Sequence, residues 1–91
     1  MPRQQRTVHY SGHVQGVGFR FTTQALARKY DVHGYVQNLP DGRVRIVVQG
    51  EPEELDRFLA EVEQRMAEYI WERKVDVQTP SGNYHGFQIR Y

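Results

Sequence analysis

The apolar residues of the chain recur with a period of two in some stretches and of about 3.6 in others, and these periods predict its elements. Strands are predicted over residues 7–11, 32–38, 43–49, 73–78 and 87–91. Helices are predicted over residues 19–30 and 51–66. After the second strand, Pro40 presets φ and Gly42 is free to take a positive φ, which predicts a hairpin turn.

The order of these elements is β-α-β-β-α-β, with a short extra strand at the C-terminal end. Two helices are too few to cover both faces of a sheet, so we expect both on one face of a mostly antiparallel sheet. This arrangement is the α+β, ferredoxin-like two-layer sandwich. Because the architecture carries many unrelated functions, it does not decide what the protein does.

The composition fits one small globular domain over residues 1–91, with a core from about residue 6 to residue 91. The formal net charge of +1 argues against a protein that binds nucleic-acid phosphates or acidic lipid. The lack of cysteine excludes disulfide scaffolds, thiolate nucleophiles and iron–sulfur clusters. No apolar run approaches the roughly 20 residues that cross a bilayer, and the polar N-terminal stretch has no secretory segment. We therefore expect a cytoplasmic protein.

The segment between the first strand and the first helix carries the candidate chemistry. Its glycines, at positions 12, 16 and 18, let the backbone curl around a ligand and turn successive N–H groups inward. No Ser, Thr, Asp or Asn stands just before the helix to cap its free N–H groups. A bound oxyanion would satisfy these donors, and the planar fork of Arg20 suits two phosphate oxygens.

Other interpretations of this segment stay open at this point. A glycine-rich turn is often only a tight connection between a strand and a helix. The loop lacks the Lys and hydroxyl that end a Walker A motif, and it lacks the third glycine of a dinucleotide-binding fingerprint. His9 and His13 do not share a helix face, because one lies on a strand and the other in the loop, so we expect no metal site.

Three stretches of the sequence resemble the acylphosphatase family: Ser11–Arg20, Gly34–Asn38 and Pro40–Gly42. The closing Gly86–Tyr91 extends the likeness over nearly the whole chain. The resemblance implies a ferredoxin-like sandwich that hydrolyses carboxyl–phosphate anhydrides without metal or cofactor. It also implies that Arg20 binds the substrate and that Asn38 positions the attacking water. The phosphate cradle that it implies comprises Gln15, Gly16, Val17, Gly18, Phe19 and Arg20.

The sequence departs from the family pattern after the second helix. Many relatives have Gly-Pro there, whereas this chain has residues 66–71, Met-Ala-Glu-Tyr-Ile-Trp. We expect Tyr69, Ile70 and Trp71 to cover one end of the core rather than to form an exposed patch.

The hydrolysis that the resemblance implies needs few catalytic side chains. The leaving group is a carboxylate whose conjugate acid has a pKa of about 4, so it departs without a general acid. Asn38 can orient water through hydrogen bonds but cannot take its proton near neutrality. We also expect that the terminal carboxylate of Tyr91 could pair with Arg20 and compete for it.

Two alternative functions belong to other classes. An RNA-binding module of the same element order needs aromatic residues on its central strands, and residues 43–49 contain none. A small-ligand regulatory module usually accompanies a catalytic domain, for which this chain has no room. We expect a monomer that binds a small acyl phosphate, and phosphate or sulfate as product-like ligands. We expect no nucleic-acid or membrane partner.

Overall fold

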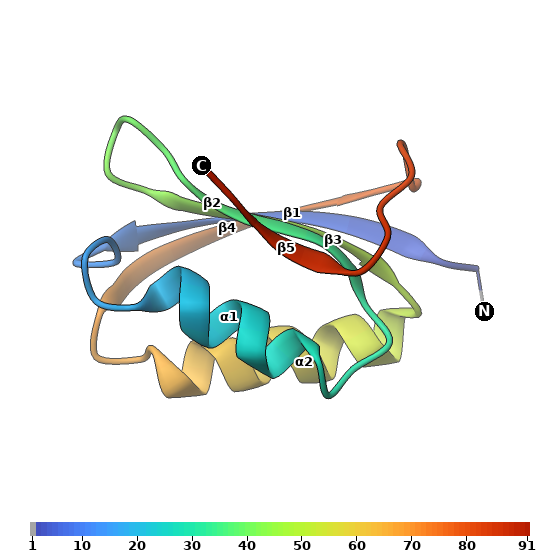
Figure 1. Cartoon of the computed structure of the whole chain (residues 1–91), viewed down its shortest axis with the longest axis horizontal. Helices are drawn as coiled ribbons and strands as arrows, with labels where there is room; N and C mark the ends of the chain where they lie inside the picture. Colours follow the sequence, from blue (N-terminus) through green and yellow to red (C-terminus); the bar gives the residue numbers. More distant parts are fainter. Residues whose placement is uncertain (1) are drawn as a thin grey trace.

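Five strands form one sheet in the order β4-β1-β3-β2-β5, and two helices cover one of its faces (Figure 1). The structure is a computed structural model that describes residues 2–91. In chain order, its elements are β1 Gln4–Gly12, α1 Phe19–Ala27, β2 His33–Asn38, β3 Val44–Gly50, α2 Pro52–Arg65, β4 Ile70–Gln78 and β5 Phe87–Arg90.

The sheet is antiparallel except at one edge. β1 lies antiparallel between β3 and β4, and β2 lies antiparallel to β3. β5 extends the sheet beyond β2 and runs parallel to it, with Tyr35 opposite Gln88. The predicted ferredoxin-like sandwich with an extra C-terminal strand is therefore confirmed.

The core lies between the sheet and the two helices. Val8 and Tyr10 alternate with half-buried residues on β1, and both are fully buried. On α2, Leu55, Phe58 and Val62 follow the helical period and are also fully buried. Pro52 stands in the first turn of α2, where its missing N–H costs no hydrogen bond. The apolar residues with a period of two thus lie on the sheet, and those with a period of about 3.6 lie on the helices that pack against it.

Several element boundaries differ by one residue from those predicted, and three differ by three residues: β1 begins at Gln4 rather than residue 7, and the end of α1 and the start of β4 also move. α1 ends at Ala27 rather than Tyr30, because the N–H groups of Lys29 and Tyr30 donate to carbonyls only three residues back, which tightens the last turn. β4 begins at Ile70 rather than residue 73, since Ile70 already pairs with Gly12 of β1. Strand pairing, rather than apolar alternation, sets the start of β4.

The segment that leads into β4 covers the core only in part. Tyr69 and Ile70 pack against the core as expected. Trp71 does not, because 79% of it is exposed, so the expectation for this residue is wrong. A bulge between Ser11 and Gly12 shifts the register where β4 begins, and it leaves Trp71 without a partner on β1. Neither helix within residues 2–91 is long and apolar enough to cross a membrane.

Candidate active site

The loop between β1 and α1 turns on two glycines with left-handed backbone. Gly16 has φ 78° and Gly18 has φ 81°, a region that residues with side chains rarely adopt. A Cβ added to either glycine would meet no atom within 4 Å. Both positions therefore need glycine for its backbone freedom, and they border open space rather than packed atoms.

The start of α1 leaves its main-chain donors free. Gly18 is the N-cap residue, and no side chain caps the helix, as the sequence predicted. The first bonded N–H of the helix is that of Thr22, which donates to the Gly18 carbonyl at 3.0 Å. Across residues 2–91, no hydrogen bond engages the N–H groups of residues 15–21. Free donors at the positive end of a helix dipole are chemically suited to an anion.

A pocket of about 270 Å³ lies where this loop faces the end of β2. Gly16, Gly18, Phe19, Arg20 and Asn38 line it, together with two further apolar side chains. The fold therefore brings both candidate catalytic residues and most of the predicted cradle to one place. Gln15 and Val17 belong to the same loop but do not line the pocket.

Arg20 is half-buried in the first turn of α1. Within the described part of the chain, its guanidinium makes no ion pair with a carboxylate. Its Cζ lies 4.9 Å from the centre of the Tyr91 ring, a cation–π contact. The contact with Tyr91 is thus made by the ring rather than by the terminal carboxylate, and it leaves the charge of Arg20 available to an anion.

Asn38 is the last residue of β2, where pairing with Val44 fixes its backbone. Its Oδ1 is buried, and no donor within residues 2–91 bonds to it. A buried acceptor without a partner costs free energy, so such an atom usually marks a place that a water or ligand fills. In this pocket, Asn38 Oδ1 can accept a hydrogen bond from a water molecule.

Gln15 has a role that the sequence did not indicate. Its Nε2 donates to the carbonyls of Leu39 at 2.8 Å and Arg43 at 3.0 Å, on the two sides of the hairpin turn. The side chain therefore ties the loop to the hairpin that follows Asn38. No pattern in the sequence predicts this contact, because its acceptors are main-chain carbonyls 24 and 28 residues away.

The other end of the loop is fixed by the segment before β4. The N–H of His13 donates to the Tyr69 carbonyl at 2.9 Å. Gly12 has φ 135°, and a Cβ there would come within 2.3 Å of the same carbonyl. Only glycine fits this position. The residues that depart from the family pattern thus hold the loop in place.

Among residues 2–91, Arg20 is the one charged side chain that lines this pocket. Over the described chain, no group of three or more His, Cys, Asp or Glu residues is placed to hold a metal ion. The chemistry that these residues can supply is therefore anion binding by main-chain N–H groups and one guanidinium, with the Asn38 amide at the same pocket.

Residues 6–89 match the acylphosphatase family. The chain is 40% identical over 88 residues to an acylphosphatase from Archaeoglobus fulgidus, covering 92% of this chain and 94% of that protein. It is 41% identical over 85 residues to one from Thermotoga maritima, covering 92% and 93% of the two chains. The crystal structure of acylphosphatase from Bacillus subtilis superposes with a TM-score of 0.86 at 31% identity, covering 97% of this chain and 99% of that one.

Proposed function

The chain belongs to the acylphosphatase family, and we propose that it hydrolyses acyl phosphates in the pocket between the β1–α1 loop and Asn38. The bond between phosphorus and the carboxylate oxygen breaks, and a bond between phosphorus and the oxygen of water forms. The products are a carboxylate and inorganic phosphate. The small acyl phosphate is the substrate class that goes with this family.

The phosphoryl group binds to the loop. Three phosphate oxygens accept hydrogen bonds from N–H groups of residues 15–20, and the Arg20 guanidinium supplies two more donors and a positive charge. Phosphoryl transfer through a loose transition state depends mainly on positioning and on charge stabilisation. Donors that are already oriented towards the phosphate stabilise the transition state without reorganising.

The attacking water is oriented by Asn38. Its Oδ1 accepts one hydrogen of the water, which directs an oxygen lone pair at phosphorus. The amide takes no proton, so the second proton leaves to a phosphate oxygen. The carboxylate leaves as an anion without a proton donor, because its conjugate acid has a pKa of about 4.

One observation supports this proposal above the others. One pocket is lined by residues of the loop, by Arg20 and by Asn38. Within the described chain, the N–H groups of residues 15–21 make no hydrogen bond, Arg20 makes no ion pair and Asn38 Oδ1 has no donor. The buried Oδ1 of Asn38 in particular points to a bound partner, because buried polar groups are normally paired.

The kinetics of two variants on benzoyl phosphate test the proposal. We expect Arg20→Lys to lower kcat/KM by about 10³-fold, because an ammonium cannot form the bidentate contact. We expect Asn38→Ala to lower kcat by about 100-fold through misplaced water, with little change in the inhibition constant of phosphate. Arg28→Lys, an exposed change just beyond the end of α1, is the matched control and should keep wild-type rates.

Three outcomes would contradict the roles given to these residues. Near-wild-type kcat/KM for Arg20→Lys would show that the reaction does not need the guanidinium. Equal losses in turnover and in phosphate affinity for Asn38→Ala would make that residue a binding group rather than a water orienter. A comparable loss of activity in Arg28→Lys would show a nonspecific effect on α1.

We propose in addition that the protein works in the cytoplasm as a monomer. The monomeric state is supported by the pocket itself, since all the groups that the reaction needs come from one chain. Sedimentation of the active protein at assay concentration tests this state, and a dimer that dissociates together with activity would contradict it.

A further inference from the structure

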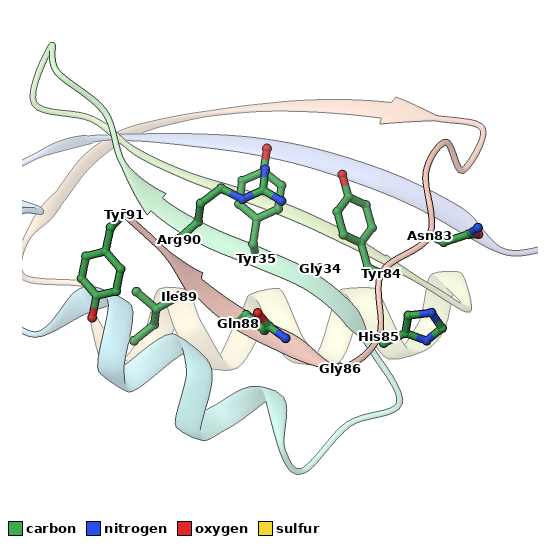
Figure 2. Close-up of a pocket in the computed structure, with 10 residues that line it drawn as sticks. All are labelled: Gly34, Tyr35, Asn83, Tyr84, His85, Gly86, Gln88, Ile89, Arg90 and Tyr91. Atoms are coloured by element: carbon green, nitrogen blue, oxygen red, sulfur yellow. The ribbon is translucent and has the colours of Figure 1, made fainter.

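A second and larger pocket lies on the face of the sheet that the helices leave open (Figure 2). Its volume is about 480 Å³, within the range of roughly 300–1,000 Å³ usual for small-molecule sites. It is lined by β2, by β5, by residues 83–86 and by Tyr91, and it shares no lining residue with the candidate active site. A ligand here would therefore not occupy the phosphate cradle.

Two tyrosine rings, tilted by 56° to each other, and one guanidinium form a wall of this pocket. Tyr35, Tyr84 and Arg90 all stand on the open face of the sheet, whereas Tyr91 points to the opposite side, towards α1 (Figure 2). The Arg90 Cζ lies 3.7 Å from the centre of the Tyr35 ring, and the Tyr84 ring centre lies 5.8 Å from that of Tyr35. Because Tyr35 is buried under these neighbours, the exposed surfaces are the outer face of the guanidinium and the Tyr84 ring.

Arg90 carries the positive charge of the pocket. In the part of the chain that the structure describes, no Asp or Glu side chain lines it, and Tyr91, which also lines it, carries the terminal carboxylate without an ion pair to Arg90. Among residues 2–91, Arg90 makes no ion pair and donates no hydrogen bond to a side chain. Its N–H groups thus remain available to a ligand, while its Cζ lies against the Tyr35 ring. The exposed side chains of Asn83 and Gln88 border the same space and offer further hydrogen bonds.

We propose that this pocket binds a small planar aromatic anion, of which a nucleoside monophosphate is the simplest form. The ring of the ligand stacks on the Arg90 guanidinium and beside Tyr84, as bases stack on arginine and aromatic planes elsewhere. Its phosphate accepts hydrogen bonds from the free edge of Arg90. An anion without a ring would make only the hydrogen bonds to Arg90. A neutral nucleoside would make only the stacking contact.

Titration of the ¹⁵N-labelled protein with AMP tests this site by NMR. Saturating inorganic phosphate is present throughout, so that the catalytic cradle is filled. We expect AMP to shift the signals of Tyr84, Gly86 and Arg90, and we expect adenosine to bind more weakly than AMP. Replacing Arg90 by Gln should weaken AMP binding by about tenfold, the usual effect of losing a charge-assisted hydrogen bond.

Arg45→Gln is the matched control. Arg45 also approaches Tyr35, with its Cζ 6.0 Å from the ring centre, but it does not line the pocket. The variant removes the same charge from the open face, and it should leave AMP affinity unchanged. Wild-type AMP affinity in Arg90→Gln, or an equal loss in both variants, would overturn the proposal.

Two further results would also overturn it. One is an AMP titration of the wild-type protein that shifts no signal of residues 83–90. The other is a short oligoadenylate that binds far more tightly than AMP and shifts signals along β1 and β3, which would indicate an extended nucleic-acid surface instead of a single-ring site.

Discussion

Gly18 combines two properties at one residue. Its φ of 81° positions the N–H groups at the start of α1, and its missing Cβ leaves the pocket open. Gly86 has nearly the same conformation, φ 74°, with the same open surroundings, but it precedes β5 and lies outside the active-site pocket. Comparing the two glycines therefore separates the free energy that the left-handed backbone costs from the role of the Gly18 conformation in binding.

We expect Gly18→Ala and Gly86→Ala to lower the free energy of unfolding by a similar amount, about 1–2 kcal/mol, because each puts a side chain in left-handed backbone. Only Gly18→Ala should also lower kcat/KM on an acyl phosphate, since only this change disturbs the phosphate donors. Urea unfolding and steady-state kinetics on both variants check this. Equal activity in the two variants would show that the Gly18 conformation is not needed for binding.

At the scale of elements, the site depends on how the β1–α1 loop is attached to its neighbours. The Gln15 side chain bonds the hairpin between β2 and β3, which begins directly after Asn38. Gln15 therefore acts on Asn38 and on the cradle together, although it does not line the pocket. We regard it as a positioning residue.

Replacing Gln15 by Ala should lower kcat more than it raises KM, because the water and the phosphoryl group lose their fixed relation while the phosphate donors remain. The loss should be about tenfold or more, in line with the sensitivity of catalysis to small misplacements. Gln24→Ala is the control, since Gln24 makes a single long contact of 3.4 Å to the Phe87 carbonyl. A KM effect alone in Gln15→Ala would assign Gln15 to ground-state binding.

The sequence predicted the order of elements and the uncapped start of α1, because both follow from periodicity and from local residue preferences. Assigning roles to Asn38 and the loop required a resemblance to a known family, since the two lie far apart in the sequence. The Gln15 contacts and the exposure of Trp71 could not be predicted. Both depend on main-chain atoms and strand register that are set by distant parts of the chain.

At the scale of the whole molecule, one buried contact links the sheet, a helix and an edge strand. Tyr10 on β1 donates to Glu63 Oε2 on α2 at 2.8 Å, and Arg73 on β4 bonds the same oxygen. Burial, followed by the charge and hydrogen bond of Glu63, raises the pKa of Tyr10 well above its ordinary value of 10.0. The folded protein therefore keeps Tyr10 protonated where the unfolded chain loses that proton.

The raised pKa of Tyr10 determines how the stability of the protein changes at alkaline pH. Above about pH 10 the unfolded state binds fewer protons than the folded state, so the free energy of unfolding falls as pH rises. Tyr10→Phe should remove this part of the slope and cost about 1 kcal/mol at neutral pH through the lost hydrogen bond. Urea unfolding at about pH 8 to 11, a range that brackets the ordinary tyrosine pKa of about 10, measures both the slope and the loss of stability.

The control for this measurement is Tyr84→Phe, which removes a tyrosine hydroxyl outside the contact of Tyr10, Glu63 and Arg73. An unchanged alkaline slope in Tyr10→Phe would show that other groups carry the effect.

The attachments of the β1–α1 loop also have a consequence for how catalytic competence arises during folding. The loop is held by Tyr69, by the hairpin after Asn38 and, at Arg20, by the ring of Tyr91. These partners come from the middle and the end of the chain, so α1 can form early while its anion cradle stays unshaped. In a refolding reaction, turnover should return only with the slowest structural phase, when the last strand has docked.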